Sequence, residues 1–105
     1  MLMVYDQDAS GPVFAGRIYF ENGAATRLEP GADPSAAKRF SEAWQAVRSL
    51  AELPLAMTKT KIIDGEEVQA YGHKMIRHGD ENFPWAVHDY LEKKFRFRVE
   101  IDTEK

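Results

Sequence analysis

Two strand–turn–strand patterns, each followed by a helix pattern, set the strongest limit on how this chain can fold. Residues 13–20 alternate between two faces, and Asn22-Gly23 then supplies residues that favour a tight turn. Residues 55–63 and 67–76 repeat this arrangement around Asp64-Gly65. Antiparallel hairpins joined by helices favour an α+β fold, in which helices cover one face of an antiparallel sheet.

The pattern of apolar side chains predicts a three-residue loop in each hairpin. In the first hairpin, a loop over residues 21–23 places Ile18 opposite Thr26 and keeps one face mostly apolar. In the second hairpin, a loop over residues 64–66 places Ile62 opposite Val68. The other face of the second hairpin is then expected to carry Lys59, Lys61, Gln69, Tyr71 and His73.

Both helices are predicted from a start signal and from the spacing of apolar residues. Asp33 is the expected N-cap of the first helix, with Pro34 in the first helical position. Pro54 is expected to end this helix near Leu53. Pro84 opens a second helix that runs to about Lys94. The core-facing stripe of the first helix consists of Phe40, Ala43, Trp44, Val47, Leu50 and Ala51.

Strands are also predicted at the two ends of the chain. A short strand over residues 2–5 precedes a loop over residues 6–12, and residues 95–101 alternate cleanly between apolar and charged side chains. We therefore expect a single α+β domain over residues 1–105. Its antiparallel sheet has about five strands, from two hairpins and a C-terminal strand, and two helices cover one face.

Composition excludes several classes of function. The formal net charge of −3, from 14 Lys and Arg against 17 Asp and Glu, gives no strongly basic surface. The chain has no cysteine, which rules out disulfides, cysteine nucleophiles and cysteine metal sites, and fits a cytoplasmic protein. No apolar stretch is long enough to span a membrane, so no membrane partner is expected. Glycine-rich phosphate motifs are absent, and no cofactor is expected.

All three histidines fall within residues 71–90, together with one of the two tryptophans. Such side chains bind metals, move protons or anchor partners. On the expected elements, His73 lies on a strand, His78 in a loop and His88 on a helix flank, so the window is interpreted as a contact surface crossing three elements. The predicted binding residues are Tyr71, His73, Arg77, His78, Trp85 and His88.

Two alternatives use overlapping residues. Convergence of His73, His78, Asp80 and His88 would give a metal-dependent enzyme, although their spacing matches no compact ligand motif. Nucleic-acid binding would instead use a basic face, where rings beside cations suit single strands. The residues of this second alternative are Lys59, Lys61, His73, Lys74, Arg77, Arg96 and Arg98.

Catalytic signatures are missing from the sequence, whereas aromatic and basic residues expected at the surface cluster together. The leading prediction is therefore a small non-enzymatic interaction or accessory module. Its partner is another protein or a second copy of the chain.

Overall fold

The structure is a computed structural model that describes residues 1–8 and 11–102. It confirms the α+β class: six antiparallel strands form a four-stranded and a two-stranded sheet, with two helices packed against them. In chain order the elements are β1 (Leu2–Asp8), β2 (Gly11–Glu21), β3 (Ala24–Pro30), α1 (Pro34–Ser49), β4 (Glu52–Ile63), β5 (Glu66–Arg77), α2 (Phe83–Phe95) and β6 (Arg98–Ile101).

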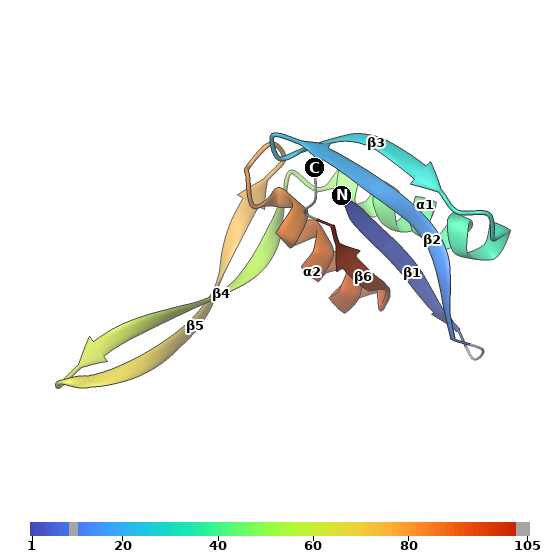
Figure 1. The fold of residues 1–105 in the computed structure, drawn as a ribbon. Coiled ribbons are helices and arrows are strands. Elements are labelled where there is room, and N and C mark those ends of the chain that lie inside the picture. Colours follow the sequence, from blue (N-terminus) through green and yellow to red (C-terminus); the bar gives the residue numbers. More distant parts are fainter. Residues whose placement is uncertain (9–10, 103–105) are drawn as a thin grey trace.

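The larger sheet has the strand order β3-β2-β1-β6 (Figure 1). The first strand, β1, therefore lies inside the sheet and pairs with the last strand, β6, at its edge. The second hairpin, β4–β5, does not join this sheet and forms its own two-stranded sheet. The strand predicted over residues 2–5 is longer than expected and continues to Asp8, into the segment predicted as a loop. It supplies the strand that bridges β2 and β6.

The predicted register of the first hairpin is wrong. Its turn has two residues, Asn22 and Gly23, with φ of 51° and 78°, as a type I′ turn requires. A β-bulge at the Tyr19/Phe20 step of the ladder then shifts the pairing, so that Ile18 lies opposite Leu28 and not opposite Thr26. The bulge lets a two-residue turn coexist with an apolar inner face. A prediction from strictly alternating side chains does not include such a bulge.

The predicted register of the second hairpin is also wrong. Asp64 and Gly65, with φ of 52° and 81°, form a two-residue turn, and the pairing runs without a bulge from Ile63–Glu66 to Glu52–Arg77. Cross-strand partners share a face. Lys59 and Lys61 therefore share a face with Ala70 and Val68, whereas Tyr71 and His73 lie on the opposite face. The expected grouping of these four residues on one face is incorrect.

Helix α1 begins as predicted, with the Asp33 side chain accepting a hydrogen bond from the Ala36 amide at 2.9 Å. Its buried stripe includes Phe40 and Trp44. The helix ends at Ser49, earlier than expected, because Leu50 takes an extended conformation; Leu53 enters the core from β4. Close packing of the helix on the sheet depends on Gly16, since a Cβ atom there would lie 2.5 Å from the Phe40 ring.

Helix α2 buries Phe83, Ala86, Val87 and Leu91 against the same core. The chain leaves the helix through Arg96, whose φ of 58° lies in the left-handed region. The last strand consequently starts at Arg98 and not at Phe95, although Phe97 is still buried. In the described part of the chain, neither helix combines the length and apolar character that crossing a membrane requires.

Beyond the pair Leu53–Ile76, which is buried in the core, the β4–β5 hairpin leaves the body of the protein (Figure 1). We call residues 55–74 the arm. It gives the molecule its elongated form, with extents of 56 × 32 × 28 Å. At about 3.3 Å per residue, ten residues from the base to the turn reach about 33 Å. Most side chains of the arm are exposed on both of its faces.

Candidate functional site

Two of the six predicted binding residues lie on the arm. Tyr71 is 80% exposed, and His73 is also exposed. Both belong to β5, where Tyr71 pairs with Thr58 and His73 with Ala56 on one face of the hairpin. Both side chains are therefore presented to solvent, and His73 lines a small hollow with Tyr90 and Lys93 of α2.

Arg77 and His78 lie where the arm joins the body. The Nε atom of Arg77 lies 3.8 Å from the Glu52 carboxylate, and the Arg77 side chain is largely exposed. His78 is held more firmly: its Nε2 donates a hydrogen bond to the Leu50 carbonyl at 2.8 Å, and its ring packs on Phe83 with centroids 4.3 Å apart. This histidine connects the end of α1 to the start of α2.

Trp85 and His88 lie on α2, with ring centroids 6.3 Å apart. Trp85 is 49% exposed. His88 Nε2 donates to the Val99 carbonyl at 3.1 Å, and Glu92 accepts from the Val99 amide at 3.2 Å. The side chains of His88 and Glu92 thus satisfy backbone groups at the outer edge of β6 and do not simply form a solvent-facing polar side of α2.

The six predicted residues consequently separate into three groups on the arm, at its base and on α2. The same is true of the alternative metal ligands. Among residues 1–8 and 11–102, no group of three or more histidine, aspartate or glutamate side chains is placed to hold a metal ion. The Asp80 side chain instead accepts a hydrogen bond from the Asn82 amide at 2.8 Å, just before α2.

The residues proposed for nucleic-acid binding are only partly brought together. Lys59, Lys61 and Lys74 line a hollow of about 440 Å³ on the arm, together with Tyr71 and His73. Arg96 and Arg98 belong to a different surface. Arg96 caps α2, and Arg98 lies on β6 with its guanidinium 3.0 Å from Glu100.

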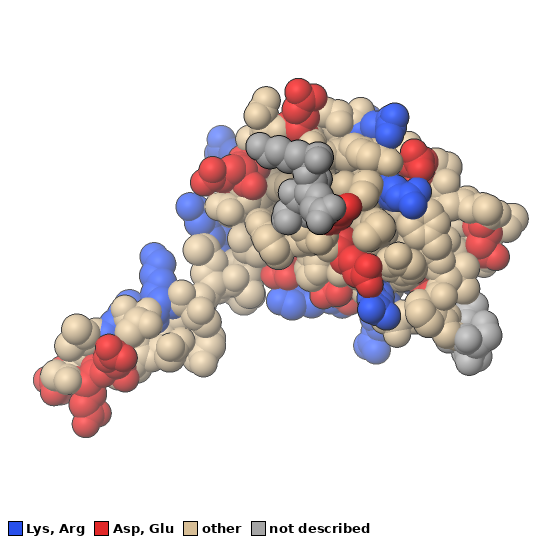
Figure 2. Space-filling model, in the orientation of Figure 1, with Lys and Arg blue, Asp and Glu red and all other residues tan. Residues whose placement is uncertain are grey.

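The arm carries a second feature that the sequence prediction missed, a separation of charge along its length (Figure 2). Its outer part, residues 62–67, contains Asp64, Glu66 and Glu67 and no Lys or Arg. The remaining residues, 55–61 and 68–74, contain Lys59, Lys61 and Lys74 and no Asp or Glu. The arm therefore has equal numbers of positive and negative side chains but an acidic tip.

Large apolar side chains are exposed along the same arm. Ile62 is 76% exposed and Ile63 53% exposed, next to the turn. Met57 and Val68 are exposed farther along. In the sequence these residues fit a buried strand face equally well, so the signal was present but ambiguous. Several large apolar residues exposed on one small element suggest a contact surface.

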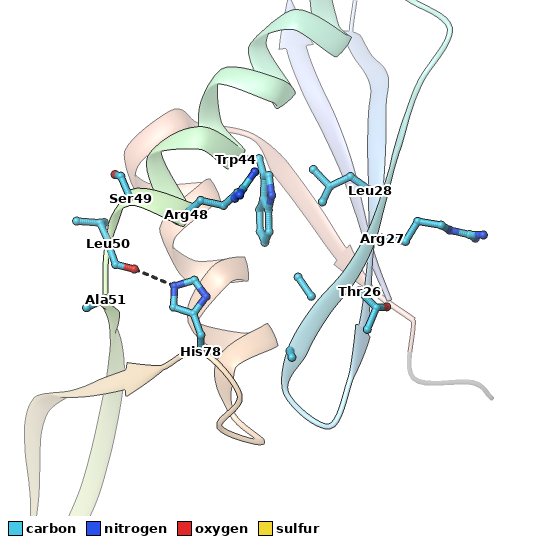
Figure 3. Close-up of a pocket in the computed structure, with 11 residues that line it drawn as sticks. Thr26, Arg27, Leu28, Trp44, Arg48, Ser49, Leu50, Ala51 and His78 are labelled. Atoms are coloured by element: carbon cyan, nitrogen blue, oxygen red, sulfur yellow. Dashed lines mark hydrogen bonds between the residues drawn. The ribbon is translucent and has the colours of Figure 1, made fainter.

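A cavity of about 760 Å³ is an open groove between β3 and the end of α1 (Figure 3). Trp44 forms its wall, Arg48 extends toward the indole and His78 lies at one end, whereas the Arg27 side chain points away. His78 is the one histidine among the residues that line the groove. Trp44 was expected in the core, and it is indeed only 7% exposed.

Comparisons of the chain with protein-family models, curated proteins and solved structures gave no match.

Proposed function

We propose that the protein is a non-enzymatic interaction module whose arm binds a protein partner or a second copy of the chain. The observation that carries this proposal is the exposure of large apolar side chains along a two-stranded hairpin, with Ile62 76% and Tyr71 80% exposed. Two strands with no covering layer are marginally stable in water. An arm of this length gains stability when another surface covers it.

The body of the protein supports this interpretation, because its core takes little from the arm. The core cluster takes only Leu53 and Ile76 from the centre of the hairpin's base, with Leu55 packed at its margin. The apolar residues farther out add nothing to this core. Their side chains are better explained by contact with another molecule than by folding of this chain.

Two of the histidines also favour an interaction role over acid–base chemistry. The Nε2 atoms of His78 and His88 each donate to a backbone carbonyl, and their rings join neighbouring elements of the body. Both histidines thus have a structural role that needs no acid–base chemistry. Tyr71, on the arm, has the exposed aromatic ring that interface anchors share.

Site-specific photo-crosslinking tests the proposal. A benzophenone amino acid placed at Tyr71 in cells that make the protein is expected to give covalent adducts of higher mass. The same group at Glu42, exposed on α1, is the matched control and is expected to give few. Absence of any adduct from Tyr71, with either another protein or the chain itself, would count decisively against an interaction arm.

Nucleic-acid binding is a second candidate, favoured by the three lysines that line the hollow on the arm. A labelled single-stranded oligonucleotide, titrated at low salt and followed by anisotropy, tests it. Replacing Lys59 and Lys61 with alanine is expected to weaken binding and to reduce the salt slope by about 1.4 for two lost contacts. Lys38→Ala on α1 is the control, and no affinity at low salt would end this candidate.

A further inference from the structure

We propose that the partner of the arm is a second copy of this chain, bound through antiparallel pairing of β5 with β5 across a two-fold axis. The two arms would form one four-stranded sheet in the order β4-β5-β5-β4. This inference rests on the proposed function, because it names the molecule that covers the arm.

The outer edge of β5 is open. In the described part of the chain, residues 66–74 of β5 make no backbone hydrogen bonds beyond those of the ladder with β4. Such an edge is a ready template for another strand. The outer side of β6, by contrast, is bonded by His88 and Glu92. The outer edge of β5 thus remains available to another strand.

The outer edge of β4 is a poorer template. Pro54 lies at its base, where proline cannot donate to a ladder, and α2 packs against this strand. In two-fold pairings of β4 with β4 that are centred on residues 59–61, these lysines would also face lysines of the second copy: Lys59 or Lys61 faces its own copy, or Lys59 faces Lys61. Lysines at these positions are a common means of discouraging edge association. The choice between the two edges thus falls on β5.

Charge then selects one register. Side chains of opposite residues share a face, and a two-fold axis perpendicular to the sheet keeps each residue on its own face. The axis must therefore pass beside a residue that faces its own copy in the second chain. With Ala70 at the axis, Glu66 lies opposite Lys74 of the second copy, and Glu67 lies opposite His73. Symmetry makes each of these contacts twice. The acidic start of β5 is therefore complementary to its own basic end.

Neighbouring registers lose this match. With Tyr71 at the axis, Glu66 and Glu67 would face the apolar residues Ile76 and Met75. With Gln69 at the axis, Glu66 and Glu67 would face Gly72 and Tyr71.

The acidic tip of the arm is visible in Figure 2. In the antiparallel arrangement the acidic start of β5 in one arm lies beside Lys74 of the other, whereas a parallel arrangement would bring two acidic tips together. A four-stranded sheet also has the width that a two-stranded hairpin lacks for independent stability.

Charge reversal tests the pairing in the full-length protein. Sedimentation velocity across micromolar concentrations is expected to show a reversible dimer. Glu66→Lys and Lys74→Glu are each expected to raise its dissociation constant about tenfold or more, because two attractive pairs become repulsive. The double variant restores the pairs with exchanged signs and is expected to recover dimerisation. Lys38→Glu on α1 is the charge-matched control.

A cysteine test reports the register directly, because the chain has no cysteine of its own. Opposite residues in an antiparallel ladder have Cα atoms about 4.5–5.5 Å apart, within the range that a disulfide spans. Ala70→Cys is expected to form a disulfide-linked dimer under mild oxidation, whereas Thr60→Cys, exposed on β4, is expected to remain largely monomeric.

The result that overturns the pairing is a monomer at all concentrations, or single and double charge variants that behave alike. Equal cross-linking from Ala70→Cys and Thr60→Cys would also overturn it. Adducts from Tyr71 with a different protein, found beside a monomeric chain, would reject this inference and leave the proposed function standing.

Discussion

Arg39 of α1 forms an ion pair with Asp6 of β1. The same guanidinium donates a hydrogen bond to the Phe95 carbonyl at 2.9 Å and lies over the Phe97 ring, 4.8 Å from its centroid. Asp6 is the one buried charged residue among those that the structure describes. Arg39 therefore connects the first strand, the first helix and the end of the second helix around a carboxylate that needs a partner.

Replacing Arg39 with alanine is expected to lower the free energy of unfolding by about 2–4 kcal/mol, because it leaves a largely buried carboxylate without its cation. Lys38→Ala, an exposed neighbour on the same helix, is expected to change it by about 0.5 kcal/mol or less. Urea denaturation followed by circular dichroism measures both. Equal effects of the two substitutions would show that the ion pair does not stabilise the fold.

Two glycines in strands are expected to respond in opposite ways to alanine. A Cβ atom at Gly16 would lie 2.5 Å from the Phe40 ring and 2.8 Å from the Glu29 carbonyl oxygen. Gly16→Ala should therefore reduce the free energy of unfolding by about 1–3 kcal/mol through overpacking. Gly72, on the arm, has no atom within 4 Å of such a Cβ. Its substitution should be neutral or slightly stabilising, as thermal unfolding of both variants would reveal.

The two tryptophans are expected to differ in the same manner. Trp44 is 7% exposed, and Trp44→Ala should lower the free energy of unfolding by about 3–5 kcal/mol. Trp85 is 49% exposed, and its replacement should lower it by about 1 kcal/mol or less. Guanidinium denaturation provides the comparison. A large loss of stability on Trp85→Ala would assign that residue to the core.

Local signals predicted the helices well. Asp33 caps α1 with the hydrogen bond that its residue type favours, and Phe40 and Trp44 are buried on the predicted stripe. Helix ends were less predictable. Leu50 continues the apolar period of α1 but lies outside the helix, because its extended conformation starts the path into β4.

The candidate site was only partly predictable. The sequence predicted that Tyr71 is exposed, and it is among the most exposed aromatic residues described. It gave no reason to separate Tyr71 from Lys59 and Lys61, because a strand pattern identifies two faces but not which faces of two strands coincide. That assignment depends on the length of the turn, because a turn longer by one residue moves every side chain of the second strand to the other face of the hairpin.

The sequence by itself determined the elements of this protein: turn residues at Asn22-Gly23 and Asp64-Gly65, a helix start at Asp33 and alternating strands are local features with local causes. Only the tertiary structure decided that the first hairpin bulges to keep Ile18 opposite Leu28 over the core, and that the second leaves the core as an arm. The physical reason is that burial acts between distant segments. The core formed by β1, β2, β6, the two helices and the pair Leu53–Ile76 imposes a register on the first hairpin and takes no residue from the outer half of the second.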